Sequence, residues 1–199
     1  MKIAIIGTGI SGLTAAWQLC YEHDLTIFEA NNYIGGHTNT VEVETQGQCY
    51  AVDTGFIVFN DWTYPNFIDL LNQLGVASQP TLMSFSVRCE RTGLEYNGEN
   101  LNTLFAQRRN LFRPSFHRMI RDILRFNREA PKLLGGSRNI SLNAYLREQN
   151  YSQEFTEHYI LPMAAAIWSA EPAVTGEMPV RFFVQFFKNH GLLSVNDRP

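Results

Sequence analysis

The sequence predicts an α/β fold that opens with a parallel βαβ unit and continues with β-hairpins and a mainly helical second half. Three observations support this prediction. Residues 2–28 read as strand, glycine-rich loop, helix and strand, in that order. Two later segments alternate apolar and polar residues on either side of short turns, as β-hairpins do. Beyond residue 100 the apolar residues recur mostly at the helical period.

The opening unit contains a glycine-rich loop between its first strand and its helix. Residues 2–6 are an apolar run of strand length, residues 13–19 read as a helix, and residues 25–28 form a second strand. The loop at residues 7–12 reads Gly-Thr-Gly-Ile-Ser-Gly and matches G-x-G-x-x-G. Because these parts occur in the right order and at the right spacing, they predict a dinucleotide-binding loop rather than an ordinary strand–turn–helix.

Each residue type in this loop has a physical role. Gly7 permits the tight turn out of the strand, Gly9 lets the backbone approach a pyrophosphate, and Gly12 lets the helix pack close to the strand. The backbone N–H groups of Ile10 and Ser11 lie at the positive end of the helix dipole. We expect them to face the phosphates.

An acid and a second glycine pair follow the second strand. Glu29 lies 22 positions after Gly7, at the end of that strand. A carboxylate there can accept hydrogen bonds from both ribose hydroxyls, and it disfavours a 2′-phosphate. The second glycine pair is Gly35-Gly36.

Local patterns predict the remaining elements. Residues 40–45 and 48–52 form one expected hairpin, and residues 83–90 and 94–96 form another. Only residues 2–6 and 25–28 read as parallel strands, so the nucleotide-binding sheet is expected to be incomplete. A helix is expected from Pro65 to Leu74, ended by Gly75, and another at residues 116–129, after Pro114. Ser141 and Ser152 are each expected to cap a helix, and the second of these helices runs toward Trp168. A last helix is expected to begin at Pro179.

Composition narrows the class of protein. With 199 residues, 45% of them hydrophobic and 18% charged, the chain suits a soluble globular protein. Its three cysteines are odd in number and widely spaced, which predicts reduced thiols and a cytoplasmic location. No apolar run approaches the ~18 residues of a membrane span. The sequence shows no metal-ligand spacing, no nucleophile elbow and no nucleic-acid signature beyond one basic helix.

That basic helix belongs to a segment of uneven charge. Residues 101–128 hold seven arginines and one acid, a net charge of +6 in a chain whose total is −3. Four of the arginines, at positions 118, 121, 125 and 128, share one helix face. One interpretation is peripheral contact with a membrane surface or an anionic lipid-like substrate. The alternative, a solvated helix face, is the commoner fate of such a pattern.

A cluster of aromatic residues near the end of the chain also has two interpretations. It can line a tunnel for a hydrophobic small-molecule substrate, or it can be core, and the helical spacing favours core. Its members are Trp168, Phe182, Phe183, Phe186 and Phe187.

Four segments together resemble the FAD-dependent amine oxidase and phytoene desaturase superfamily, and most of all bacterial flavin-containing amine oxidoreductases described as predicted NAD/FAD-binding proteins. They are residues 7–16, 28–30 (Phe-Glu-Ala), 34–37 (Ile-Gly-Gly-His) and 52–55 (Val-Asp-Thr-Gly). The resemblance implies a Rossmann-like, FAD-binding part at residues 1–78 and a partial, mainly helical substrate or cap domain at residues 79–199. In this superfamily a second glycine pair after the ribose acid is a flavoprotein feature, which favours FAD over NAD.

The resemblance also implies cofactor-binding roles residue by residue. The pyrophosphate would be held by Gly7, Gly9, Ile10, Ser11 and Gly12, and the adenosine ribose by Glu29 and Ala30. The diphosphate and flavin side would be approached by Gly35 and Gly36, and the edge of the isoalloxazine ring by Gly55, Phe56 and Ile57. The family usually has an arginine after the second glycine pair, where this chain has His37. We hypothesise that His37 and Thr38 replace that contact more weakly, because histidine is charged only when its pKa is raised. The alternative is an exposed loop histidine.

These expectations describe an FAD-dependent oxidoreductase of amine oxidase or desaturase type, a flavoprotein whose flavin accepts a hydride from a C–N or C–C bond. No residue of the chain is assigned as a catalytic acid or base, and none as a metal ligand. Family members are longer, so the chain is expected to be an N-terminal fragment that is inactive alone. Two alternatives stay open: an NAD-dependent dehydrogenase with the same fingerprint, and a non-catalytic fragment or binding module that retains only the fold.

Overall fold

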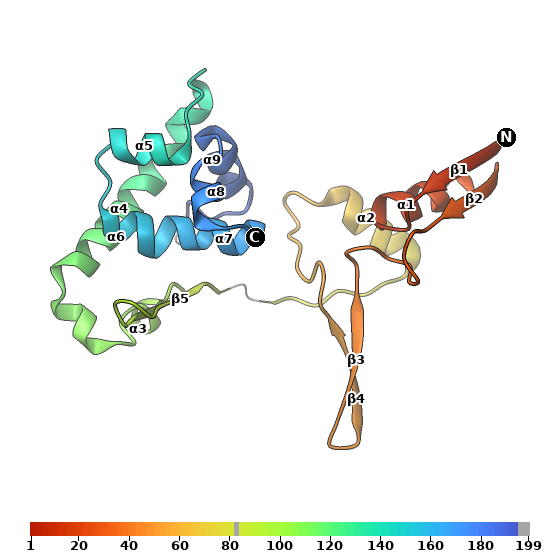
Figure 1. Ribbon diagram of the computed structural model, residues 1–199, viewed down its shortest axis with the longest axis horizontal. Helices are drawn as coiled ribbons and strands as arrows, with labels where there is room; N and C mark the ends of the chain where they lie inside the picture. The colour runs from red at the N-terminus through yellow and green to blue at the C-terminus, as the bar shows by residue number, and fades with distance from the viewer. Residues whose placement is uncertain (82–83, 195–199) are drawn as a thin grey trace. The chain divides into compact units, whose positions relative to one another are not determined.

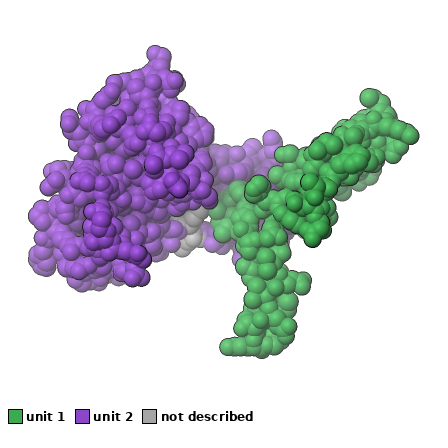
Figure 2. All heavy atoms as spheres, in the orientation of Figure 1, with its two compact units in different colours: residues 1–59 green, residues 60–199 purple. Residues whose placement is uncertain are grey.

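The computed structural model describes residues 1–81 and 84–194 (Figure 1). The chain divides into two compact units, residues 1–59 and residues 60–199 (Figure 2). This division follows compactness alone. The predicted boundary between a cofactor-binding part and a substrate part, at residue 78, therefore stays a prediction.

The first unit contains the predicted βαβ unit and the first predicted hairpin. Strands β1 (Lys2–Ile6) and β2 (Asp24–Phe28) pair in parallel, with Lys2 opposite Asp24. The helix between them, α1 (Ile10–Leu19), begins three residues earlier than predicted, directly after Gly9. Strands β3 (Thr40–Thr45) and β4 (Gln48–Asp53) form the antiparallel hairpin (Figure 1).

The second unit begins with a helix and a short hairpin. Helix α2 (Pro65–Leu74) starts at a proline and ends at Gly75, whose φ of +67° is the left-handed conformation that glycine favours. Strands β5 (Ser86–Cys89) and β6 (Leu94–Asn97) pair antiparallel. Strand β5 is shorter than the predicted strand 83–90, of which Met83 lies outside the described residues. Each sheet of the described residues has two strands, and only β1 and β2 are parallel, as predicted.

The rest of the second unit is helical, as predicted. The Ser141 hydroxyl accepts a hydrogen bond from the Ala144 N–H (3.2 Å), and the Ser152 hydroxyl accepts one from the Phe155 N–H (3.3 Å), so both serines cap helices. No helix among the described residues is long and apolar enough to cross a membrane. The elements are α3 (Leu101–Leu104), η1 (Arg108–Phe112), α4 (Pro114–Glu129), η2 (Ala130–Gly135), α5 (Leu142–Glu148), α6 (Gln153–Phe155), η3 (Thr156–Ile160), α7 (Leu161–Trp168), α8 (Pro172–Gly176) and α9 (Val180–Asn189).

A group of aromatic rings lies in the core of this unit, contributed by α4, α5, α6, α9 and the segment between α5 and α6. The buried Phe126 ring lies 5.6 to 6.3 Å from the rings of Tyr145, Tyr151, Phe155 and Phe183. The pairs with Tyr145, Tyr151 and Phe183 are edge-to-face, a packing that adds to the stabilisation from buried area. In the aromatic cluster of α9, Phe183 and Phe187 are buried core residues, whereas Phe182 is 53% exposed and packs against Trp168.

The helical run from Ser152 to Trp168 is less regular than predicted, because η3 is a π-helix between α6 and α7. In an α-helix the N–H of residue 162 would donate to the carbonyl oxygen of His158, four residues earlier. Residue 162 is a proline, which has no N–H, so this hydrogen bond cannot form. The hydroxyl of Tyr96, a buried residue of β6, donates a hydrogen bond to that carbonyl instead (2.6 Å). A distant strand thus satisfies the carbonyl group that the proline leaves without this donor.

Candidate functional site

The glycine-rich loop connects the ends of the two parallel strands. The Gly7 N–H donates to the Phe28 carbonyl oxygen (2.7 Å), so the exit of β1 is joined to the end of β2. Gly7 has a φ of +92°, which residues with a side chain rarely adopt. The first glycine of the motif is therefore required by the turn itself.

Gly12 and Gly9 serve different purposes in this loop. A Cβ atom on Gly12 would lie 2.1 Å from the Gly7 carbonyl oxygen and 3.4 Å from the Ile5 side chain, so glycine lets α1 pack against β1. A Cβ atom on Gly9 would have no atom within 4 Å. Gly9 is also the N-cap residue of α1, and no side chain caps the helix there. Gly9 therefore leaves open space at the N-terminus of α1, and a helix N-terminus suits an anion.

Glu29 is held in place beside the loop by hydrogen bonds from Thr8 and Asn31. Its Oε2 accepts from the Thr8 N–H (2.8 Å) and from the Thr8 hydroxyl, and its Oε1 accepts from the Asn31 N–H (2.9 Å). The Thr8 hydroxyl, followed by the Asn31 and Thr8 N–H groups, lowers the pKa of Glu29 to about 2. A carboxylate has about four acceptor positions, and three are used by these donors, so about one is left for a ribose hydroxyl.

The acid sensitivity of the fold provides a test of this arrangement. Because the folded pKa of Glu29 lies below 4.5, the group stabilises the folded state above about pH 4.5 and loses that effect as pH falls toward 2. We expect Thr8→Val to raise the pKa of Glu29, because the hydroxyl donor is lost. Thr8→Ser should keep the pKa low. An NMR titration of the Glu29 carboxyl carbon measures both, and an unchanged titration in Thr8→Val would contradict the assignment.

The second glycine pair packs onto the first loop. The Gly35 N–H donates to the Thr8 carbonyl oxygen (3.0 Å), and Gly35 has a φ of +116°. A Cβ atom on Gly36 would lie 3.0 Å from the Cα of Gly9. The two glycine-rich segments, 27 residues apart in sequence, therefore meet backbone to backbone.

The segment after this pair lies beside the end of the first hairpin. A Cβ atom on Gly55 would lie 2.0 Å from the His37 carbonyl oxygen, so only glycine fits. Next to it, the Thr54 N–H donates to the Asn39 carbonyl oxygen (2.8 Å). Of the other predicted residues, Thr38 donates its N–H to the Gly35 carbonyl oxygen (3.0 Å), while Ala30, Phe56 and Ile57 are exposed.

The geometry fits a dinucleotide with its phosphates at the start of α1 and its ribose at Glu29. Cofactor contact by each of the fourteen predicted residues remains a prediction. Sequence reasoning missed Thr8, which is 4% exposed and connects the loop, the acid and the second glycine pair. The only signal for Thr8 was a hydroxyl residue between the first two motif glycines. Among the described residues, no group of three His, Cys, Asp or Glu side chains could hold a metal ion.

Comparisons with known sequences add independent information. A family model described as flavin containing amine oxidoreductase matches residues 10–191. A probable flavin-containing monooxygenase 1 of Arabidopsis thaliana is 38% identical over 80 residues, covering 37% of this chain and 15% of that protein. A 4,4'-diapophytoene desaturase (4,4'-diaponeurosporene-forming) of Staphylococcus aureus strain Newman is 49% identical over 43 residues, covering 21% of this chain and 9% of the desaturase.

Solved structures show the same fold. Wild-type putrescine oxidase bound to putrescine matches with a TM-score of 0.55 and 20% identity, over 99% of this chain and 44% of the oxidase. A variant from a redesign of cofactor binding in putrescine oxidase matches with a TM-score of 0.55 and 19% identity, over 98% of this chain and 43% of the variant. The chain thus spans less than half the length of these structures, and a smaller part of the two curated relatives.

Proposed function

Because the chain belongs to the flavin-containing amine oxidoreductase family, we propose that it is part of an oxidoreductase of amine oxidase or desaturase type and that its N-terminal segment binds FAD. FAD is the cofactor that family membership implies. When bound, the flavin supplies the redox chemistry by accepting a hydride from a C–N or C–C bond of a small-molecule substrate. Membership in this family does not favour the alternative of an NAD-dependent dehydrogenase.

The observation that carries this proposal is the contact between the two glycine-rich segments at the start of α1. Gly36 lies against Gly9, and the Gly35 N–H is bonded to Thr8, beside the space that Gly9 leaves open. In the proposal, the N–H groups of Ile10 and Ser11 bind the pyrophosphate. Glu29, ionised and held by Thr8, accepts a hydrogen bond from a ribose hydroxyl and repels a 2′-phosphate.

The remaining predicted residues would contact the flavin half of the cofactor. His37 and Thr38 are proposed to touch the pyrophosphate where the family usually has an arginine. Gly55, Phe56 and Ile57 are proposed to run along the isoalloxazine ring, where their backbone N–H groups can donate hydrogen bonds. Similarity in fold to a putrescine oxidase supports a C–N bond as the substrate bond, and similarity to a diapophytoene desaturase supports a C–C bond.

Cofactor identity tests the proposal on this chain directly. We expect the purified chain to bind added FAD with the flavin absorption bands of a flavoprotein, and to release FAD on heating, as identified by mass spectrometry. FAD should bind more tightly than NAD, and Glu29→Ala should weaken FAD binding. His37→Arg should retain FAD equally well or better, because arginine is always charged. Tighter binding of NAD, or binding of neither cofactor, would overturn the proposal.

A further inference from the structure

Helix α4 carries four arginines on the side opposite its buried apolar residues. We call Arg118, Arg121, Arg125 and Arg128 the arginine face. At about 100° per residue these positions span an arc of about 80°. The buried Phe116, Met119 and Phe126 occupy the opposite side. Arg118, Arg121 and Arg128 are exposed, whereas Arg125 is half-buried and lies over the ring of the core residue Tyr151 (4.3 Å).

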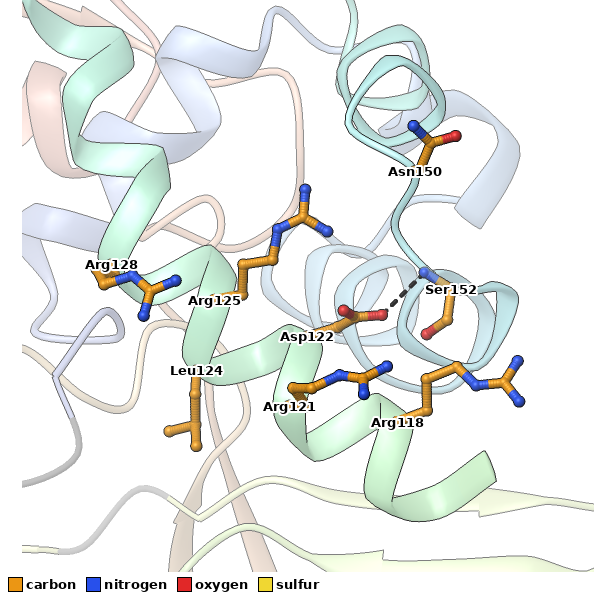
Figure 3. A pocket seen from close by; sticks show the side chains of 8 residues that line it. All are labelled: Arg118, Arg121, Asp122, Leu124, Arg125, Arg128, Asn150 and Ser152. Atoms are coloured by element: carbon orange, nitrogen blue, oxygen red, sulfur yellow. Dashed lines mark hydrogen bonds between the residues drawn. The ribbon is translucent and has the colours of Figure 1, made fainter. Parts of the chain in front are cut away.

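The arginine face borders an open hollow of about 710 Å³ (Figure 3). Arg118 and Arg121 extend to the same side of α4, toward the segment that carries Ser152 (Figure 3). Asp122, the acid that lines this hollow, is 5% exposed, and its Oδ2 accepts a hydrogen bond from the Ser152 N–H (2.9 Å). Its carboxylate binds this backbone N–H, and its negative charge also helps to raise the pKa of Arg125.

The positive charge of the arginine face is only partly neutralised. Arg125 and Arg128 share one acid, Glu129, at 3.0 and 3.2 Å. Arg118 lies 3.8 Å from Glu154, a long ion pair. Arg121 has no ion pair or hydrogen bond to another of the described residues. The least compensated charges are thus those of Arg118 and Arg121, one helical turn apart.

Exposed apolar side chains accompany these charges. Phe112, two residues before α4, is 88% exposed, and Leu111 beside it is 44% exposed. On α4 itself Leu124 is 54% exposed and lies among the lining residues of the hollow. Exposed apolar side chains next to arginines are typical of surfaces that lie at a membrane interface, where apolar groups enter the acyl boundary and guanidinium groups bind lipid phosphates.

We propose that the arginine face, together with Phe112 and Leu111, docks on the phosphate headgroups of an anionic membrane surface. Charge complementarity favours this partner because guanidinium groups bind phosphate through paired hydrogen bonds. The exposed apolar residues distinguish it from a purely electrostatic partner such as an acidic protein. The contact would be peripheral, and it stands independently of whether the chain binds FAD.

Vesicle co-sedimentation of the full chain tests the proposal. We expect binding to vesicles of phosphatidylglycerol mixed with phosphatidylcholine, weaker binding as salt rises, and little binding to phosphatidylcholine alone. Arg118→Gln combined with Arg121→Gln should weaken vesicle binding about 25-fold, because each basic residue near an anionic surface contributes about fivefold to the affinity. Phe112→Ser should weaken the binding that persists at high salt.

A matched variant controls for net charge. Arg88→Gln with Arg91→Gln removes the same charge from two exposed arginines that pair elsewhere, with Glu95 (3.3 Å) and Glu157 (2.8 Å), and it should bind vesicles nearly as the wild type does. Circular dichroism should show that all variants are folded. Equal loss in both double variants, salt-independent binding, or no preference for anionic vesicles would overturn the proposal. Stronger retention on polyglutamate than on vesicles would overturn the proposal as well, because it would indicate that the arginine face binds an acidic protein.

Discussion

Gly12→Ala is expected to destabilise the βαβ unit, whereas Gly9→Ala is expected to weaken cofactor binding and leave the fold intact. A Cβ atom on Gly12 would lie 2.1 Å from the Gly7 carbonyl oxygen, so α1 must move away from β1. Forced overpacking of this kind typically costs about 1–3 kcal/mol. A Cβ atom on Gly9 meets nothing within 4 Å, and its φ of −67° suits alanine. That atom would instead occupy the space proposed for the pyrophosphate.

Two measurements separate these effects. Urea unfolding followed by circular dichroism should show a large loss of stability in Gly12→Ala alone, and FAD fluorescence quenching should show at least about tenfold weaker binding in Gly9→Ala. Gly135→Ala is the matched control, because a Cβ atom there also meets nothing within 4 Å, and Gly135 belongs to η2 rather than to the loop. Equal destabilisation by the Gly9 and Gly12 substitutions would show that both glycines are structural.

Tyr96→Phe is expected to lower the free energy of unfolding by about 1–3 kcal/mol, because it removes a hydrogen bond to a partly buried carbonyl. The Tyr96 hydroxyl donates to the His158 carbonyl oxygen (2.6 Å), for which Pro162 offers no N–H. Burial raises the pKa of Tyr96, so the hydroxyl keeps its proton. Phenylalanine preserves the ring contact with Phe116 at 5.7 Å, so packing should change little.

A double-mutant cycle identifies the cause of that loss. Pro162→Ala restores an N–H four residues after His158, so Tyr96→Phe should cost less in the Pro162→Ala background than in the wild type. The four free energies of unfolding, measured in urea, give the coupling between the two positions. Additivity within about 0.3–0.5 kcal/mol would mean that the proline and the tyrosine act independently.

Much of the fold could be predicted from the sequence because its signals are local. The βαβ unit follows from a motif of fixed spacing, and the caps Ser141 and Ser152 act within three residues of their partners. The π-helix η3 could not be predicted from local signals. It lies beside Pro162, and its His158 carbonyl is bonded to Tyr96, which is 62 residues away in the sequence. Helix α8, five residues long, is too short to give a periodic pattern.

Part of the candidate site could also be predicted from the sequence, and part could not. The motif predicted which residues gather at the start of α1, since glycine and acid positions in this fingerprint are fixed by spacing. It did not predict that Thr8 would donate to Glu29, 21 residues away. Nor did it predict that Gly55 would lie against the His37 carbonyl. These contacts depend on tertiary geometry, on which hydrophobic periodicity carries no information.

The contact between the two glycine-rich segments has a consequence for the kinetics of ligand binding. Gly35 is bonded to Thr8, and Gly36 lies against Gly9, so the chain's own backbone restrains both segments. Their conformational entropy is lost during folding rather than on ligand binding. A ligand therefore meets a preorganised surface, which reduces the ordering cost that would otherwise weaken its affinity. Loosening either segment should slow association as well as weaken binding.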